Sequence, residues 1–272
     1  MTGESAADAP FSGRTVIVTG ASTGIGRVTA LRLARQGARV WAAARDERRL
    51  EELAAEHSGI VPAPADVSND ADRAALVEQC EPVDVLVNNA GLGWKGMVED
   101  MPPDKVRQLL DVNVLALIDL TQRVLPGMLE RRRGHIVNVG SIAGYVASPS
   151  ETVYCATKFA VQGFTDGLRR EVGRRGVQVT LIAPGPIKTE FMARIRTGEP
   201  AAEAGALDYG LSPDAVAKAI MRALTRERVP GYRTITVPRI GGFSRIGSAP
   251  LMSHATDLAT RSRARKALAG EE

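Results

Sequence analysis

Tyr154 and Lys158 are the residues whose types and spacing suggest chemistry most directly, because only four positions separate a phenol from an amine. Apolar residues around them recur at helical spacing and predict a helix over residues 151–175, on which both side chains share one face. A phenol titrates near pH ~10, and a neighbouring ammonium favours the phenolate, so we expect Lys158 to lower the pKa of Tyr154. The pair predicts acid/base chemistry, although the same spacing also occurs in surface pairs on amphipathic helices.

Ser141 adds a hydroxyl thirteen positions before Tyr154, just after an apolar strand predicted over residues 135–139. At the carboxyl end of a parallel strand, this side chain can hydrogen-bond a substrate oxygen. A nucleophilic serine would need a histidine base, and the three histidines fall at a helix end, at a strand start and in the tail: His57, His135 and His254. Ser141 is therefore predicted to polarise an oxygen, and a hydrolase is not indicated.

A glycine-rich turn follows the first strand and precedes the first predicted helix, in the segment Thr19-Gly-Ala-Ser-Thr-Gly-Ile-Gly26. Glycines in this position let the backbone approach a pyrophosphate and direct free N–H groups toward it. The spacing G-x-x-x-G-x-G differs from the usual dinucleotide pattern, and glycines also serve tight turns, but the strand–turn–helix context favours cofactor binding. The residues of this turn predicted to bind the cofactor are Gly20, Ser22, Thr23, Gly24, Ile25 and Gly26.

The end of the second strand bears on the choice of dinucleotide. An acidic residue there would bind the ribose 2′-hydroxyl, but the segment Val40-Trp-Ala-Ala-Ala-Arg45 ends in a guanidinium. Arg45 can pair with a 2′-phosphate, which favours NADP over NAD, and Asp46 beside it can compete for that role or for the arginine. Arg45 is alternatively a solvated residue at a helix start.

The elements that must position these residues alternate between apolar strands and helix-length stretches. Strands are predicted over residues 14–19, 39–43, 60–65, 83–88, 135–139, 177–182 and 234–237. Such a pattern requires a mostly parallel sheet with helices on both faces, so the predicted fold is α/β, a Rossmann-type doubly wound seven-stranded sheet in three layers. We expect a flexible N-terminus over residues 1–12, one catalytic domain over 13–245 with a substrate loop near 190–211, and a C-terminal extension over 246–272.

Composition and charge exclude several other classes of protein. The 35 basic and 31 acidic residues nearly balance and are interleaved, so no nucleic-acid partner is expected. The two cysteines, Cys80 and Cys155, lack metal-ligand spacing, and we expect free thiols and no bound metal. Residues 1–10 contain no apolar run, and no stretch of about 18 apolar residues occurs, so a cytoplasmic location is expected.

Taken together, the ordered motifs resemble the short-chain dehydrogenase/reductase family, in its ordinary, non-extended branch. The resemblance rests on the glycine-rich turn, Asp66-Val67, Asn88-Asn-Ala-Gly91, Asn113, Ser141, Tyr154-Cys-Ala-Thr-Lys158 and Pro184-Gly185, and it covers residues 13–189. It implies hydride transfer between a nicotinamide and a carbonyl or alcohol, a catalytic tetrad of Asn113, Ser141, Tyr154 and Lys158, and a homodimer or homotetramer.

The resemblance also implies roles for single residues. Lys158 would hold the nicotinamide ribose, and Asn113 would help to hold a water that relays protons, unless it is only a helix-bending or capping amide. Asp66 can accept from the adenine amino group, although it is also an ordinary turn residue. The further positions expected at the cofactor are Val67, Asn89, Ala90, Gly91, Tyr154, Pro184, Gly185, Ile187 and Thr189.

The candidate residues around the substrate are mostly apolar. Apolar residues predicted to line its pocket are Trp94, Met97, 143–146, Phe191, Met192 and Tyr209, which suggests a hydrophobic ketone, aldehyde or alcohol, while Lys95, Lys188 and Arg194 leave an anionic substrate open. A β-ketoacyl thioester reductase and a non-catalytic NADP-binding regulatory protein are the alternatives. The basic tail over residues 253–269 would touch acidic lipid or a second subunit, or form a solvated helix.

Overall fold

The fold is built on one parallel sheet of seven strands, in a computed structural model that describes residues 9–80, 82–187, 210–225 and 234–237. The strand order is β3-β2-β1-β4-β5-β6-β7, and every pairing is parallel. The strands are β1 (Thr15–Thr19), β2 (Arg39–Ala44), β3 (Ile60–Pro64), β4 (Val85–Asn88), β5 (Gly134–Val139), β6 (Val177–Pro184) and β7 (Thr234–Val237). The predicted Rossmann-type, seven-stranded doubly wound architecture is confirmed.

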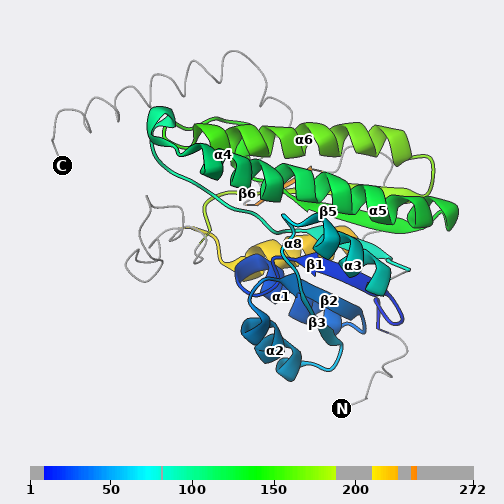
Figure 1. The fold of residues 1–272 in the computed structure, drawn as a ribbon. Helices are drawn as coiled ribbons and strands as arrows, with labels where there is room; N and C mark the ends of the chain where they lie inside the picture. Colours follow the sequence, from blue (N-terminus) through cyan, green and yellow to red (C-terminus); the bar gives the residue numbers. More distant parts are fainter. Residues whose placement is uncertain (1–8, 81, 188–209, 226–233, 238–272) are drawn as a thin grey trace.

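Helices cover both faces of this sheet (Figure 1). They are α1 (Gly24–Ala34), α2 (Glu47–Glu56), α3 (Asp70–Cys80), α4 (Pro103–Leu110), α5 (Ala116–Glu130), α6 (Thr152–Val172) and α8 (Pro213–Thr225). Alternation along β1 divides the core, because Val16 and Val18 pack in one cluster with α1 and α8 while Ile17 packs in another with α3, α5 and α6. Strand β1 is therefore buried on both faces, as its continuous apolar sequence requires.

Helices α4 and α5 are joined by a π-helical turn, Asp111–Leu115, into one continuous helix over Pro103–Glu130. By length and composition alone this helix is long and apolar enough to cross a membrane, a test that core helices of soluble proteins also pass. Its buried residues Leu120, Val124 and Met128 pack against the sheet. These contacts account for one side of the helix, whereas Leu115 is 51% exposed.

Several predicted boundaries shift by a few residues. Strand β6 continues through Pro184, and β4 begins at Val85 rather than at residue 83. Helix α6 ends at Val172 instead of residue 175, and Gly176, with a φ of +90°, lies in the turn that leads into β6. Both cysteines are buried and free. The N-terminal residues 1–8, most of the expected substrate loop and the C-terminal extension lie outside the described residues.

Candidate active site

The candidate site lies at the carboxyl edge of the sheet, near the point where strand order reverses between β1 and β4. Chain order runs outward from β1 through β2 to β3 and resumes on the other side with β4. Ligands of open α/β sheets bind at such a reversal. The loops after β1, β4 and β5 carry the glycine-rich turn, Asn89 and Ser141, so the topology gathers these segments at one edge.

The glycine-rich turn leaves the first turn of α1 open for an anion. Gly20 and Gly24 have positive φ angles of 65° and 56°, which glycine adopts without strain. A Cβ on Gly26 would lie 2.3 Å from the carbonyl oxygen of Gly20, so the turn closes tightly only with glycine there. Thr23 occupies the N-cap without a side-chain capping bond, and the first turn has no acidic residue. These features fit a pyrophosphate, because the free N–H groups and the helix dipole favour negative charge.

Thr19 and Asn89 hold this turn against the end of β4. The hydroxyl of Thr19 accepts hydrogen bonds of 3.0 Å from the backbone N–H groups of Asn89 and Ala90. The Asn89 amide donates to the carbonyls of Thr19 (2.9 Å) and Gly20 (3.2 Å). The Asn89 side chain therefore braces the turn. Sequence reasoning did not identify Thr19, although its place at the end of β1 is a signal for such a role.

Arg45 and Asp66 come together beyond the ends of β2 and β3. Burial raises the pKa of Asp66, but hydrogen bonds from Ser68 and the charge of Arg45 outweigh it, and the pKa lies below its usual value. Asp46 is the N-cap of α2, accepting from the backbone of Arg49 at 3.1 Å and pairing with the Arg49 side chain. The predicted competition from Asp46 is thus reduced, because its carboxylate is engaged within α2, and Arg45 is exposed.

Tyr154, Lys158 and Ser141 form the chemical centre of the site. Tyr154 and Lys158 lie in α6 and are 9% and 6% exposed, and the Lys158 ammonium donates to the Val139 carbonyl at 3.2 Å. The side chains of Ser141 and Tyr154 hydrogen-bond each other. Ser141 also accepts from the backbone N–H of Ala143 at 3.1 Å, which fixes its hydroxyl at the start of a short 3-10 turn, Ile142–Gly144. A phenol, a hydroxyl and an amine thus meet in one buried place.

The expectation that Lys158 lowers the pKa of Tyr154 is wrong for the chain by itself. Burial raises the pKa of Tyr154 above its usual value, against a smaller lowering by the bond with Ser141. Burial also lowers the pKa of Lys158 to about 8. The Lys158 nitrogen lies 5.7 Å from the centroid of the Tyr154 ring and donates to a strand carbonyl, so it faces the ring and Val139. In both residues burial therefore favours the neutral form.

Asn113 lies in the π-helical turn between α4 and α5, where π-bulges often mark functional sites. Its buried amide accepts from the Leu92 N–H at 2.7 Å and donates to the Leu92 carbonyl at 2.8 Å. It also donates to Thr157 at 3.0 Å, and Thr157 donates to the Tyr154 carbonyl at 2.7 Å. Asn113 thereby links the loop after β4 to α6. Thr157 was not predicted as a site residue, although it lies inside the Tyr154–Lys158 motif.

Gly91 completes this arrangement. A Cβ at this position would lie 3.4 Å from the Asn113 side-chain oxygen and 3.7 Å from the Lys158 nitrogen. The loop after β4 therefore passes directly beside both tetrad residues. The structure brings all four predicted catalytic residues to one region of the carboxyl edge.

Comparison with known proteins gives the family. The family model described as short chain dehydrogenase matches residues 14–200. The chain belongs to the short-chain dehydrogenase/reductase family. An uncharacterized oxidoreductase of Staphylococcus saprophyticus is 35% identical over 220 residues, covering 78% of this chain and 89% of that protein. The chain is therefore an oxidoreductase of this family.

Solved structures of short-chain dehydrogenases/reductases share the fold. The closed form of serine dehydrogenase complexed with NADP+ has a TM-score of 0.76 and 32% identity, covering 84% of this chain and 96% of that chain. A candidate betaketoacyl-ACP reductase has a TM-score of 0.72 and 31% identity, covering 83% and 96%. The relatives thus differ in substrate while keeping one architecture.

The residues expected around the substrate of this dehydrogenase/reductase divide into two groups. Trp94 and Ala143 pack in a buried apolar cluster with Tyr154, whereas Met97 is 55% exposed.

The segment after β6, which was predicted to contact the cofactor, is held by backbone bonds. The Gly185 N–H donates to the Val237 carbonyl at 2.8 Å, and Ile187 pairs with Leu211 in an isolated bridge. Thr189, Phe191, Met192 and Tyr209 lie outside the described residues.

Proposed function

We propose that this short-chain dehydrogenase/reductase transfers hydride between NADP(H) and the carbonyl or secondary alcohol of a hydrophobic substrate, with Tyr154 as the acid/base. The hydrogen bond between Tyr154 and Ser141, in a buried site one helical turn from Lys158, carries this proposal. A carbonyl oxygen that replaces this mutual bond would meet two hydroxyl donors at once. Two donors aimed at one oxygen stabilise the alkoxide that forms during reduction.

Each residue of the chain has a separate task in this scheme. When bound, the reduced nicotinamide supplies the hydride for the carbonyl carbon. Tyr154 delivers its proton to the carbonyl oxygen while Ser141 donates a hydrogen bond to that oxygen. Lys158, with a pKa of about 8, is a group that can take up and release a proton near neutral pH and would hold the nicotinamide ribose. Asn113 would hold the loop after β4 against the first turns of α6 through its bonds to Leu92 and Thr157.

Replacing the tyrosine tests the mechanism. Tyr154→Phe removes the proton donor but keeps the ring in its cluster, so turnover should fall about 10²- to 10⁴-fold while the NADPH dissociation constant changes less than about twofold. NADPH oxidation over a panel of ketones and aldehydes measures turnover. A Tyr154→Phe variant with most of the wild-type activity would refute the assignment.

The preference for NADP(H) rests on Arg45. Its guanidinium is exposed beside Asp66, and no acid at the end of β2 is free to take the ribose 2′-hydroxyl, because Asp46 caps α2. Arg45→Ala should weaken NADPH binding about tenfold or more and leave NADH binding unchanged. Arg48→Ala is the control, as Arg48 pairs with Glu52 on the surface of α2. If the ratio of the NADPH and NADH affinities is the same in Arg45→Ala as in the wild type, Arg45 does not determine the cofactor preference.

A β-ketoacyl thioester reductase is the second candidate, favoured by the likeness to a candidate betaketoacyl-ACP reductase. Including β-ketoacyl thioesters in the substrate panel separates it from a reductase of simple ketones. Tight NADPH binding without turnover on any member of the panel would instead indicate a regulatory protein.

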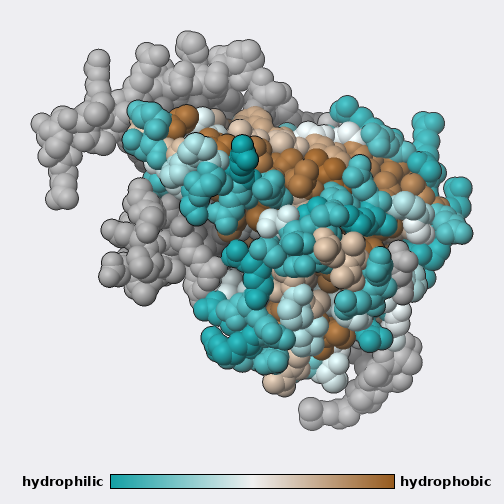
Figure 2. Space-filling view, viewed as in Figure 1, coloured by the Kyte–Doolittle hydropathy of each residue, from teal (hydrophilic) through white to brown (hydrophobic). Residues whose placement is uncertain are grey.

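We further propose that residues 13–245 form one catalytic domain, that the protein acts in the cytoplasm, and that it is a homodimer or homotetramer. Figure 2 shows hydrophobic residues gathered over α5 and α6, and the described chain exposes Leu115 (51%) and Phe159 (44%). Apolar exposure of this kind is typical of an interface. Analytical ultracentrifugation of wild type and Phe159→Ser would measure the assembly, and a wild-type monomer at every concentration would contradict it.

A further inference from the structure

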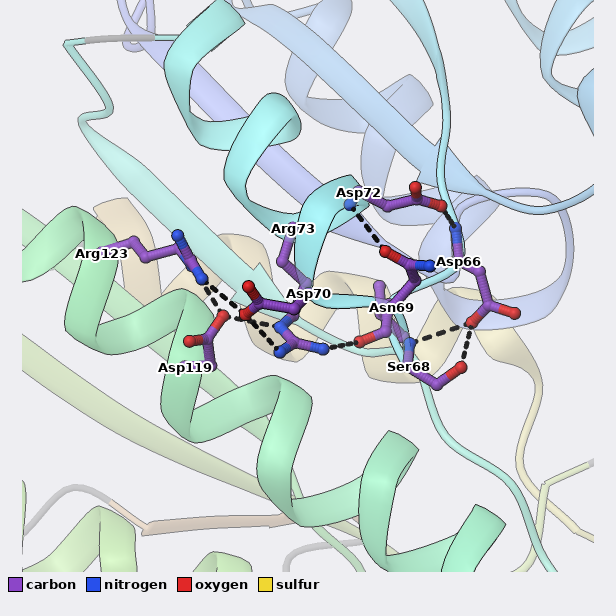
Figure 3. A network of polar contacts seen from close by, with 9 residues as sticks. Asp66, Ser68, Asn69, Asp70, Asp72, Arg73, Asp119 and Arg123 are labelled. Carbon is purple, nitrogen blue, oxygen red and sulfur yellow. Dashed lines mark hydrogen bonds and ion pairs between the residues drawn. The ribbon is translucent and has the colours of Figure 1, made fainter.

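A buried arginine on α3 connects the turn after β3 to α5 (Figure 3). Arg73 is 3% exposed, and its Nε donates to Asp119 Oδ2 on α5 at 2.6 Å. Its Nη1 donates to the backbone carbonyl of Val67 at 2.9 Å, and its Nη2 reaches Asp70 at 3.0 Å. One guanidinium therefore ties three segments of the chain together. The mechanism above uses none of these bonds.

Asp119 fixes the orientation of this guanidinium. Burial raises the pKa of Asp119, but hydrogen bonds from Arg123 and Arg73 outweigh it and keep the carboxylate ionised. Arg123 donates to Asp119 and to Asp70, each at 2.7 Å. The two arginines thus share the same two carboxylates. Within the described residues, the Val67 carbonyl accepts from Arg73, whereas Arg123 bonds to the carboxylates of Asp70 and Asp119.

The turn that Arg73 holds contains Asp66 and Val67. Asp66 Oδ1 accepts from the N–H and the hydroxyl of Ser68, at 2.9 and 2.7 Å, and the Asp66 N–H donates to Asp72 at 2.8 Å. These local bonds shape the turn but stay within it and the start of α3 (Figure 3). The bond from Arg73 instead links the Val67 carbonyl to α5 through Asp119, and it adds to the packing of the Val67 side chain in the core.

We propose that Arg73 is a positioning residue for the adenine end of the cofactor site. It rests on the proposed function, in which Asp66 and Val67 receive the adenine. The Val67 side chain is 7% exposed, so a carbonyl left without Arg73 at this place has little access to water. The turn would then rearrange to satisfy the group, because a buried unpaired carbonyl is unfavourable. Asp66 would move with it and lose its alignment with the adenine amino group.

The consequence is confined to one end of the dinucleotide. Tyr154 and Lys158 belong to α6 and Ser141 to the loop after β5, whereas the Arg73 side chain bonds to Asp119, Val67 and Asp70. Removal of Arg73 should therefore weaken contacts to the adenosine part and leave the nicotinamide part as it is. A general loss of structure would affect both parts equally.

The experiment compares Arg73→Gln with the matched control Arg123→Gln, which removes a guanidinium from the same two carboxylates. Isothermal titration calorimetry gives the dissociation constants of NADPH and of adenosine 2′,5′-bisphosphate, and the fluorescence of bound NADPH reports on the nicotinamide environment. For Arg73→Gln we expect about tenfold weaker binding of both ligands, the change that one lost charge-assisted hydrogen bond corresponds to. At saturation the emission maximum of bound NADPH should equal that of the wild type. Arg123→Gln should bind both ligands within about twofold of wild type.

Three results would overturn the proposal: wild-type affinity of Arg73→Gln for the bisphosphate, an equal loss in Arg123→Gln, or an altered emission maximum of saturated Arg73→Gln. Should Arg73→Gln not fold, Arg73→Lys takes its place. An ammonium cannot hold Asp119 and Val67 together as the planar fork does, so a smaller loss in the same direction is expected, and unchanged affinity overturns the proposal. A wild-type protein that binds neither ligand would refute the proposed function instead.

Discussion

The burial of Lys158 should make the free energy of unfolding depend on pH, because it lowers the pKa of this lysine from 10.5 to about 8. Between these values the unfolded chain holds a proton on this lysine that the folded chain has released. Stability must therefore rise with pH in that window, since the unfolded state binds more protons. Below about pH 8 both states are protonated, and the full unfavourable effect of burying the ammonium is present. Lys158→Met removes the titrating group and should abolish this pH dependence.

The magnitude follows from the shift. A pKa lowered from 10.5 to about 8 corresponds to about 3 kcal/mol between the two protonation limits. Most of it falls between about pH 7 and pH 10, so the difference in the free energy of unfolding between wild type and Lys158→Met should grow by about 2–3 kcal/mol in favour of the wild type. Tyr154 has a raised pKa and acts in the opposite direction at high pH, but it is present in both proteins and largely cancels.

Urea unfolding followed by far-ultraviolet circular dichroism measures this difference at each pH. Lys105→Met is the control, because Lys105 is exposed on α4 and its ammonium donates to the Gln108 side chain at 3.3 Å. Its profile should run parallel to that of the wild type. A wild-type minus Lys158→Met difference that stays constant from about pH 7 to pH 10 would show that Lys158 is not desolvated, and the reasoning would fail.

Two further variants test how the site is held. Gly144→Ala places a Cβ 2.6 Å from the Lys158 carbonyl oxygen, so the turn that carries Ser141 must shift and turnover should fall about tenfold or more. Gly163→Ala is the control, because nothing lies within 4 Å of its Cβ. It should keep turnover and raise the free energy of unfolding by up to about 1 kcal/mol. Asn113→Ala leaves the N–H and the carbonyl of Leu92 unpaired and should lower the free energy of unfolding by about 2 kcal/mol, roughly twice the effect of Thr157→Val. Equal effects of the two variants would contradict the importance of the two hydrogen bonds between Asn113 and Leu92.

The parts of the site that sequence predicts are those encoded within a few residues. The glycines at 20 and 24 need positive φ angles, and Tyr154 and Lys158 share a helix face, so local spacing alone indicates both features. The role of Arg73 depends on Asp119, which lies 46 positions away, and no local pattern marks such a pair. The direction of the Tyr154 pKa was predicted wrongly for the same reason. Spacing places an ammonium near the phenol, but burial by distant segments decides which effect is larger.

The pKa values of Tyr154 and Lys158 bear on the direction of the proposed reaction. Because burial raises the pKa of Tyr154 and lowers that of Lys158, the chain by itself favours a neutral phenol and a lysine that titrates close to neutral pH. A neutral phenol is the form that donates a proton to a carbonyl oxygen, so the reductive direction needs no prior ionisation of Tyr154. Oxidation of an alcohol would need the phenolate, which the hydrogen bond from Ser141 favours. In the proposed mechanism, burial therefore favours the protonated form of Tyr154 that reduction uses.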